Sequence, residues 1–398
     1  MSRRIYMDDN ASAPLRDCAR AAAIEAMAFR NPSAVHAEGR NARALIDTAR
    51  DKVAGYAAVR AEDVIFTASG SEANMLALDP ALESNGNAVT HLLVSAIEHP
   101  SVAAGGRFGR QAAQSIPVLE SGIIDLAALQ RLLSDLPQGA VPLVSVMAAN
   151  NETGVIQPIC ELSEIVHSHD GVLHCDAVQV AGRIGFENAT HGADLMSISA
   201  HKLGGLTGAG ALVLRNAALS LSPLVSGGSQ ERNRRAGTEA VAAIAAFGAS
   251  VDEATGEATL WDGVSACREQ IEAHVLNTTP DAIIAGRNAP RLPNTINVIL
   301  PGMRAETAVI AFDLAGTAIS SGSACSSGKV TSSPVLRAMG YGTEDSASAL
   351  RISLPRTTTE EDTDQFCAIF DRVIGTLRRN AGHDGPALDD QSTARGAA

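Results

Sequence analysis

The sequence contains no long uninterrupted apolar run. A membrane-spanning helix needs about 18 apolar residues in succession, and no stretch of this chain approaches that length. The first ten residues, MSRRIYMDDN, carry two arginines but lack the apolar segment that follows the basic residues of a secretory signal. We therefore expect a cytoplasmic protein that does not interact with membranes.

Closely spaced cysteine pairs are also missing. The six cysteines are scattered along the chain, and none belongs to a C-x-x-C pair. This pattern argues against structural zinc and against the disulfide framework of a small secreted protein. We expect no metal site, and each cysteine must be considered singly.

Basic residues are few. The chain has 31 lysines and arginines against 44 acidic residues, a net charge of −13, and its only lysines are Lys52, Lys202 and Lys329. Proteins that bind nucleic acids or anionic membranes need basic patches, so we expect neither partner. The length of 398 residues, with 45% apolar and 19% charged residues, is typical of a folded protein of two or three domains.

Short apolar runs alternate with helix-compatible stretches in the first two thirds of the chain. These runs are DVIFT (63–67), HLLVSA (91–96), PLVSVM (142–147), GVLHCD (171–176), DLMSIS (194–199) and GALVL (210–214). Several are almost continuously apolar, which is typical of strands buried on both faces. The pattern predicts an α/β large domain over residues 15–256, built on a mostly parallel, doubly wound sheet whose ligands bind beyond the carboxyl ends of the strands.

The remainder of the chain predicts a second, smaller unit. A helix-compatible stretch over residues 238–276 leads into short strands, TINVIL and LRISL, mixed with further helices. We expect residues 1–14 and 257–379 to form a small α+β domain. Residues 380–398 are rich in small and polar residues without periodicity, and we expect a disordered tail there.

Two patterns imitate known sites. GSACSSGKV (322–330) resembles a phosphate-binding P-loop, but five residues instead of four separate its glycines and valine replaces the magnesium-binding hydroxyl residue. His167, His169, His174 and Cys175 suggest metal ligands, yet they straddle a helix end and a strand, whose successive side chains point to opposite faces. We assign neither pattern to a site.

Polar residues follow the predicted strands where a cofactor would lie. Lys202 comes directly after the buried strand DLMSIS, where a desolvated amine is suited to bonding a carbonyl group. Asp176 ends another strand, His99 ends a third, and the serines and glycine of residues 69–71 begin a helix that exposes backbone N–H groups. Pyridoxal phosphate requires a lysine, a carboxylate, a polar partner for the ring oxygen, an aromatic cover and a phosphate cradle. Each residue alone has a structural alternative, but together they predict this cofactor.

The motifs NPSAVHAEGR, FTASGSEAN, EHPSV, NNETGVIQP, HCDAVQ, SISAHK, RRAGT and SSGSACSSG resemble those of cysteine desulfurases in the class V aminotransferase group. The resemblance covers about residues 5–365 and implies the fold type I of pyridoxal-phosphate-dependent transferases. It implies that Lys202 holds the cofactor and Asp176 pairs with the ring nitrogen.

The resemblance also implies the roles of further residues. The ring oxygen would face Gln179 and Asn151, and the ring would stack with His99, which is also a plausible proton carrier. The phosphate would be held by Gly70, Ser71, Ser199 and His201, and by Thr238 of a partner subunit in a homodimer. The substrate carboxylate would be bound by Asn31 and Arg351.

Cys325 would be the nucleophile that takes the substrate sulfur. Its Ser/Gly-rich surroundings differ from the apolar runs in which structural cysteines usually lie. The resemblance thus predicts conversion of L-cysteine to L-alanine with a persulfide on Cys325, destined for a sulfur-acceptor or scaffold protein, as in iron–sulfur cluster assembly. Two alternatives stay open: a selenocysteine lyase on the same scaffold, and a catalytically idle adaptor that binds sulfur carriers.

Overall fold

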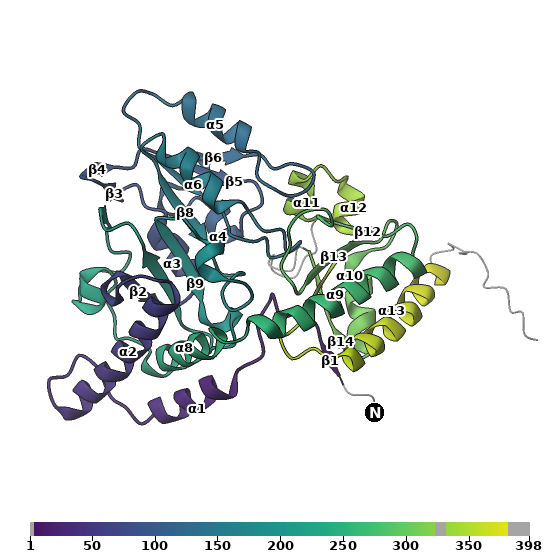
Figure 1. The fold of residues 1–398 in the computed structure, drawn as a ribbon, viewed down its shortest axis with the longest axis horizontal. Coiled ribbons are helices and arrows are strands. Elements are labelled where there is room, and N and C mark those ends of the chain that lie inside the picture. The colour runs from purple at the N-terminus through teal and green to yellow at the C-terminus, as the bar shows by residue number, and fades with distance from the viewer. Residues whose placement is uncertain (1–3, 323–331, 381–398) are drawn as a thin grey trace, which may run out of the picture.

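A seven-stranded sheet forms the centre of the larger of two regions (Figure 1). The structure is a computed structural model that describes residues 4–322 and 332–380. The sheet has the order β2-β10-β9-β8-β7-β5-β6, with strands β2 (Val64–Thr67), β5 (His91–Ser95), β6 (Ala113–Ile116), β7 (Pro142–Ser145), β8 (Val172–Asp176), β9 (Leu195–Ser199) and β10 (Gly210–Leu214). Strand β10 is antiparallel to β2 and β9, and the other neighbours are parallel. The predicted, mostly parallel α/β sheet is confirmed.

Both faces of this sheet are buried, which explains the nearly continuous apolar runs. In β5, Leu93 packs into one hydrophobic cluster, whereas Leu92 and Val94 pack into another on the opposite face. The first cluster includes helices α2 (Ala37–Tyr56), α5 (Leu126–Ser134), α6 (Ile159–His167) and α8 (Val241–Ala254). The second includes α3 (Gly70–Ala77) and α4 (Pro100–Ala103). The sheet is therefore the middle layer of three.

The smaller region has its own sheet and its own core. Its antiparallel strands follow the order β12-β13-β16-β15, namely β12 (Ile283–Ile284), β13 (Thr295–Ile299), β16 (Ala349–Ser353) and β15 (Ser320–Ser321). Helices α9 (Ala258–Thr278), α10 (Ala305–Leu314) and α13 (Glu360–Asn380) lie beside this sheet (Figure 1). The core takes side chains from residues 261–374 and also from Ile5 and Met7. The exact domain boundaries stay a prediction.

Shorter elements complete the described chain. They are β1 (Ile5–Tyr6), α1 (Asp17–Ala26), β3 (Glu83–Ser84), β4 (Asn87–Ala88), α7 (Phe186–Ala189), β11 (Leu219–Ser220), β14 (Thr317–Ala318), α11 (Pro334–Ala338) and α12 (Thr343–Ala347). Strand β1 pairs in parallel with β14, which attaches the N-terminal end of the described chain to the smaller region. In residues 4–322 and 332–380, no helix has both the length and the apolarity needed to cross a bilayer.

Two differences from the sequence-based expectation concern the long helical stretch and the large sheet. The helix-compatible stretch 238–276 contains two helices, because α8 ends at Ala254 and α9 begins at Ala258. Gly256 lies in this break, where glycine is tolerated better than inside a helix. The next residue, Glu257, forms an ion pair of 2.6 Å with Arg16. The edge strand β6, with the sequence AQSI, was not predicted because two of its four residues are polar and exposed.

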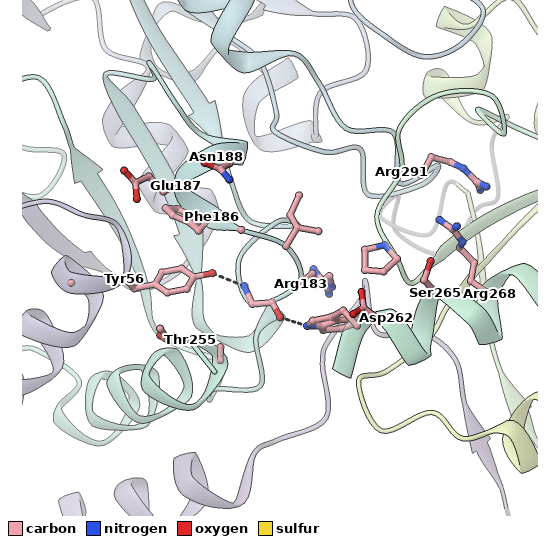
Figure 2. Close-up of a pocket in the computed structure, with 17 residues that line it drawn as sticks. Tyr56, Arg183, Phe186, Glu187, Asn188, Thr255, Asp262, Ser265, Arg268 and Arg291 are labelled. Atoms are coloured by element: carbon pink, nitrogen blue, oxygen red, sulfur yellow. Dashed lines mark hydrogen bonds between the residues drawn. The ribbon is translucent and has the colours of Figure 1, made fainter. Parts of the chain in front are cut away.

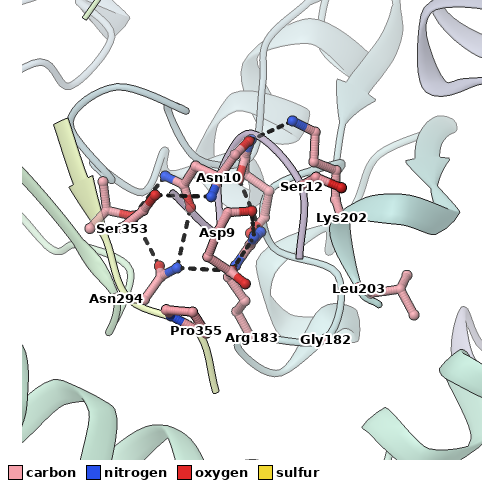
Figure 3. Close-up of polar contacts among 12 residues, drawn as sticks. Asp9, Asn10, Ser12, Gly182, Arg183, Lys202, Leu203, Asn294, Ser353 and Pro355 are labelled. Atoms are coloured by element: carbon pink, nitrogen blue, oxygen red, sulfur yellow. Dashed lines mark hydrogen bonds and ion pairs between the residues drawn. The ribbon is translucent and has the colours of Figure 1, made fainter. Parts of the chain in front are cut away.

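An N-terminal segment, residues 8–12, crosses between the two regions (Figure 3). On the side of the smaller region, the Asn10 backbone N–H donates to Ser353 Oγ at 3.0 Å, and the Asn10 side chain donates to Thr295 Oγ1 at 2.9 Å. On the side of the large sheet, Arg183 forms a 2.7 Å ion pair with Asp9. The segment thus joins both regions at the carboxyl edge of the large sheet.

Candidate active site

A cavity of about 420 Å³ lies at the carboxyl ends of the large sheet's strands. Ten of the residues predicted from the sequence line it: Gly70, Ser71, His99, Asn151, Asp176, Gln179, Ser199, His201, Lys202 and Arg351. They come from both regions, since Arg351 belongs to β16 and the others belong to the larger one. The topology therefore brings together side chains that are up to 281 positions apart, from Gly70 to Arg351.

Gly70 begins α3 directly behind β2. Ser69 caps this helix, because its hydroxyl accepts a hydrogen bond of 3.1 Å from the Glu72 backbone N–H. A Cβ atom on Gly70 would lie 2.9 Å from Val178 Cγ2 and 3.1 Å from Ser199 Cβ. Only glycine permits this close approach, which holds the first turn of α3, with its free backbone N–H groups, against the ends of β8 and β9.

Asp176 ends β8 and is 5% exposed. Its Oδ2 atom accepts a hydrogen bond of 2.8 Å from Asn74 Nδ2, and its Oδ1 atom accepts one of 3.1 Å from the Val178 backbone N–H. These contacts fix the plane of the carboxyl group at the cavity wall. Asn74 was not predicted as a site residue, although it lies in the quoted motif FTASGSEAN.

His99 caps the N-terminus of α4 and is joined to Asp176 through a short chain of hydrogen bonds. Asn74 Nδ2 also donates to Ser101 Oγ at 2.9 Å, and Ser101 Oγ lies 2.8 Å from His99 Nδ1. The Ser101 backbone N–H donates to the same Nδ1 atom, so the proton of the neutral ring resides on Nε2. Burial lowers the pKa of His99, although the Asp176 charge opposes this shift. The ring is therefore a neutral imidazole near pH 7.

Lys202 ends a 3-10 turn, Ala200–Lys202, that follows β9. Its Nζ atom donates to the backbone carbonyls of Asn10 and, at 3.0 Å, of Ala11. The neighbouring His201 has a pKa lowered to about 4, by burial first and by the Lys202 charge second. His201 is thus also neutral near pH 7, and it offers its ring nitrogens for hydrogen bonding without adding a charge.

Arg351 reaches the cavity from β16, and its side chain is 4% exposed. Its Nη2 atom donates to Asp8 Oδ1 at 2.8 Å and its Nη1 atom to the Asn151 carbonyl at 3.2 Å. Its Nε atom is buried, and no residue in the described part of the chain forms a hydrogen bond with it. Besides Asp8, the N-terminal segment contributes Asn10 and Ala11 to the cavity wall, and the sequence predicted none of these three residues.

Two of the predicted site residues that the structure describes, Asn31 and Thr238, do not line this cavity. Asn31 is exposed, and its side chain accepts a hydrogen bond of 2.9 Å from the Ser33 backbone N–H. Thr238 is exposed on the loop before α8. Cys325 lies outside the described residues. The roles of these three residues stay predictions.

A second cavity, of about 720 Å³, lies between α7 and α9 (Figure 2). Arg268 and Arg291 line one end, and Tyr56 and Phe186 line the other. It contains none of the predicted site residues. Among the described residues, no group of histidine, cysteine and acidic side chains is arranged to hold a metal ion, and His174 of the excluded pattern lies buried between Ser145 and Ser197.

Comparisons with known proteins show the family of the chain. The family model "Aminotransferase class-V" matches residues 5–366. Cysteine desulfurase IscS of Dictyoglomus turgidum is 35% identical over 388 residues, covering 95% of this chain and 96% of the relative. A cysteine desulfurase of Enterobacter agglomerans is 34% identical and covers 94% of each chain.

Solved structures give the same result. The NifS-like protein of Rickettsia africae superimposes with a TM-score of 0.85 at 32% identity, over 94% of this chain and all of that one. A protein titled "SspA in complex with cysteine" has a TM-score of 0.73 at 28% identity, over 89% of this chain and all of that one. The chain therefore belongs to the class-V aminotransferase family and, within it, to the cysteine desulfurases.

Proposed function

We propose that this protein uses pyridoxal 5′-phosphate to convert L-cysteine to L-alanine and passes the sulfur to Cys325. The observation that carries the proposal is the convergence of Lys202, Asp176 and His99 on one cavity of about 420 Å³. The near full-length similarity to proteins named cysteine desulfurases supports it, as does the relative whose title names a complex with cysteine.

The cavity fits the cofactor on grounds independent of the relatives. It offers a lysine amine and a carboxylate whose orientation is fixed by two hydrogen bonds. It also contains the start of helix α3 at Gly70, where an anion has space but a Cβ atom does not. Ser71, Ser199 and His201 add polar groups around that helix start. A phosphate is well accommodated where backbone N–H groups and hydroxyls converge.

Each residue then has a defined task. Lys202 would bond the cofactor aldehyde through its amine, and Asp176 would pair with the ring nitrogen. When bound, the cofactor supplies an electron sink that stabilises a carbanion at the substrate's α-carbon. Neutral His99 would stack on the ring and, with its proton on Nε2, is suited to carry a proton within the cavity.

Two residues serve the substrate itself. The planar fork of Arg351 matches the geometry of a carboxylate, so this arginine would bind the carboxylate of L-cysteine. The cofactor supplies no acceptor for the departing sulfur, and we assign this role to the Cys325 thiolate. A sulfur-acceptor or scaffold protein, for example one in iron–sulfur cluster assembly, would then receive the sulfur.

A homodimer would complete the site. Thr238 does not reach the cavity of its own subunit, and we propose that Thr238 of the partner subunit reaches the phosphate. Exposed apolar side chains support a contact surface around α1: Ile24 is 63% exposed, Met27 70% and Val35 89%. Light scattering should therefore give the mass of a dimer, and a fully active monomer would contradict this part of the proposal.

Replacement of Lys202 tests the central claim. Wild-type protein reconstituted with pyridoxal phosphate should be yellow and, with a dithiol present to reduce the persulfide, should release equal amounts of alanine and sulfide from L-cysteine. Lys202→Ala should keep its fold by circular dichroism but lose both the covalent bond that borohydride traps and the activity. Lys52→Ala is the matched control, because Lys52 forms a surface ion pair with Asp252 and lies outside the cavity. A borohydride-trapped adduct that persists in Lys202→Ala would refute the proposal.

A further inference from the structure

Arg183 lies behind the candidate site, four positions beyond Gln179 in the non-helical turn that follows β8. Its side chain is 1% exposed and is enclosed between the N-terminal segment and the turn that follows β8 (Figure 3). Gln179 lines the site cavity, whereas Arg183 lines the second cavity on the other side (Figure 2). Arg183 therefore does not line the site cavity, but it contacts Gln179, which does.

The contact between Arg183 and Gln179 determines which way the glutamine amide points. Arg183 Nη1 donates to the Gln179 side-chain Oε1 at 3.0 Å and to the Gln179 backbone carbonyl at 2.7 Å. A guanidinium group has donors only, so the amide atom that faces it must be the oxygen. The NH₂ group of Gln179 is consequently turned away from Arg183.

The amide NH₂ group points toward the reactive lysine. Gln179 Nε2 donates at 3.2 Å to the Asn10 carbonyl, and this is the same carbonyl to which Lys202 Nζ donates. Two donors that converge on one oxygen lie in a common neighbourhood. The donor end of Gln179 is therefore on the side of the cavity where Lys202 lies.

The opposite side of Arg183 prevents the guanidinium from rotating. Its Nε and Nη2 atoms donate to Asp9 Oδ2 at 3.2 Å and 2.7 Å, and Asn294 Nδ2 donates to the same oxygen at 3.3 Å. The Asp9 side chain is only 3% exposed. If Arg183 turned away, it would leave the Asp9 carboxylate buried without its counter-charge, which is costly.

We infer that Arg183 is a positioning residue that locks the Gln179 amide with its NH₂ group toward the ring oxygen of the cofactor. This inference rests on the proposed function. The phenolic oxygen of the ring needs a hydrogen-bond donor, and the reversed amide would present acceptor lone pairs to it instead. Arg183 thus acts on the cofactor through Gln179, although it does not line the cofactor cavity itself.

A double-mutant cycle tests this inference with Arg183→Met, Gln179→Leu and the double variant. The readouts are the dissociation constant for pyridoxal phosphate by equilibrium dialysis and the pH midpoint of the visible absorption band of the bound cofactor. Each single variant should weaken cofactor binding about three- to tenfold, the value of one lost hydrogen bond, and should shift the midpoint. The double variant should be no worse than Gln179→Leu, because Arg183 acts through that side chain.

Arg291→Met is the matched control. Arg291 also lines the second cavity and also holds a buried carboxylate, Glu272, at 2.7 Å and 3.0 Å, but it does not contact the cofactor cavity. This variant should lower the melting temperature without changing cofactor affinity or the pH midpoint. If Arg183→Met behaves in the same way, or if its effects add to those of Gln179→Leu, the inference is wrong.

Two further variants keep the test decisive if Arg183→Met does not fold. Arg183→Lys keeps a positive charge beside Asp9 but loses the planar guanidinium. It should therefore shift the pH midpoint of the absorption band in the same direction as Arg183→Met does. Gln179→Glu exchanges the inward donor for an acceptor and should weaken cofactor binding more than Gln179→Leu does; equal or tighter binding would overturn the inference. Wild-type protein that forms no visible band would instead refute the proposed function, so the two failures are distinguishable.

Discussion

Replacement of Arg351 by lysine should damage substrate use without damaging the cofactor site. The guanidinium reaches the cavity with two of its nitrogens held, by Asp8 at 2.8 Å and by the Asn151 carbonyl at 3.2 Å. Lysine keeps the positive charge but has a single ammonium, which cannot make two parallel hydrogen bonds to a carboxylate. The substitution therefore removes the two-pronged contact with the substrate carboxylate but keeps the positive charge.

The magnitude follows from the lost contact. A hydrogen bond to a charged group contributes about 1.5–3 kcal/mol, and about 1.4 kcal/mol corresponds to a factor of ten. We expect Arg351→Lys to lower kcat/KM for L-cysteine about ten- to hundredfold, measured by alanine release under initial-rate conditions. The visible spectrum of the bound cofactor should stay close to that of the wild type.

Arg356→Lys is the control for this prediction. Arg356 forms an ion pair with Glu257 at 3.2 Å and lies outside the site cavity, so its replacement should leave kcat/KM unchanged. If Arg351→Lys turned over L-cysteine at the wild-type rate while its spectrum was normal, the substrate carboxylate would bind elsewhere and the assignment of Arg351 would be refuted.

Three other changes have defined outcomes. Gly70→Ala places a Cβ atom 2.9 Å from Val178 Cγ2, and such overpacking should weaken pyridoxal phosphate binding about tenfold in equilibrium dialysis; unchanged affinity would contradict the phosphate assignment. Burial lowers the pKa of His174 to about 3. Below pH 6.5, His174 therefore binds a proton in the unfolded chain but not in the folded chain. Urea titrations should show the free energy of unfolding falling by about 2 kcal/mol between pH 7 and pH 5 from this group, a loss that His174→Gln should not show. Cys325→Ala should bind the cofactor and L-cysteine but release no sulfide, and retained sulfide release would remove Cys325 from the mechanism. Cleavage of selenocysteine by the same variant would show that selenium departs without this thiol.

The sequence predicted the central sheet well because its strands are buried on both faces. Continuous apolar runs such as GALVL have no plausible exposed alternative, so their assignment as strands is reliable. The edge strand β6 carries Gln114 and Ser115 toward solvent and lacks this signal. The division between α8 and α9 depends on the contact of Glu257 with Arg16, which lie 241 positions apart. Local hydrophobic periodicity cannot predict a contact between residues so distant in the sequence.

The candidate site was predictable to the extent that its residues follow strands. Lys202, Asp176 and His99 lie at or just after the ends of apolar runs. Parallel strands bring such residues together at the carboxyl edge of the sheet. Asn74 was missed because its role consists of two side-chain contacts, to Ser101 and to Asp176, that only the folded chain creates. Asp8 was missed for a similar reason, since its contact with Arg351 spans 343 positions.

The crossing of the N-terminal segment has a consequence for how the protein is made. Asn10 leaves the ribosome well before Ser353, yet its backbone N–H bonds to Ser353, 343 positions later. Closing so long a loop is slow and requires all of the chain between these two residues. During synthesis, the large sheet has all of its strands once Leu214 has emerged, whereas the cavity lacks Arg351 and Asn10 lacks its partner Ser353 until those residues have emerged. A nascent chain therefore contains every strand of the large sheet long before the candidate site can be completed, and the proposed cofactor would find its full set of partners only after residue 353 has emerged.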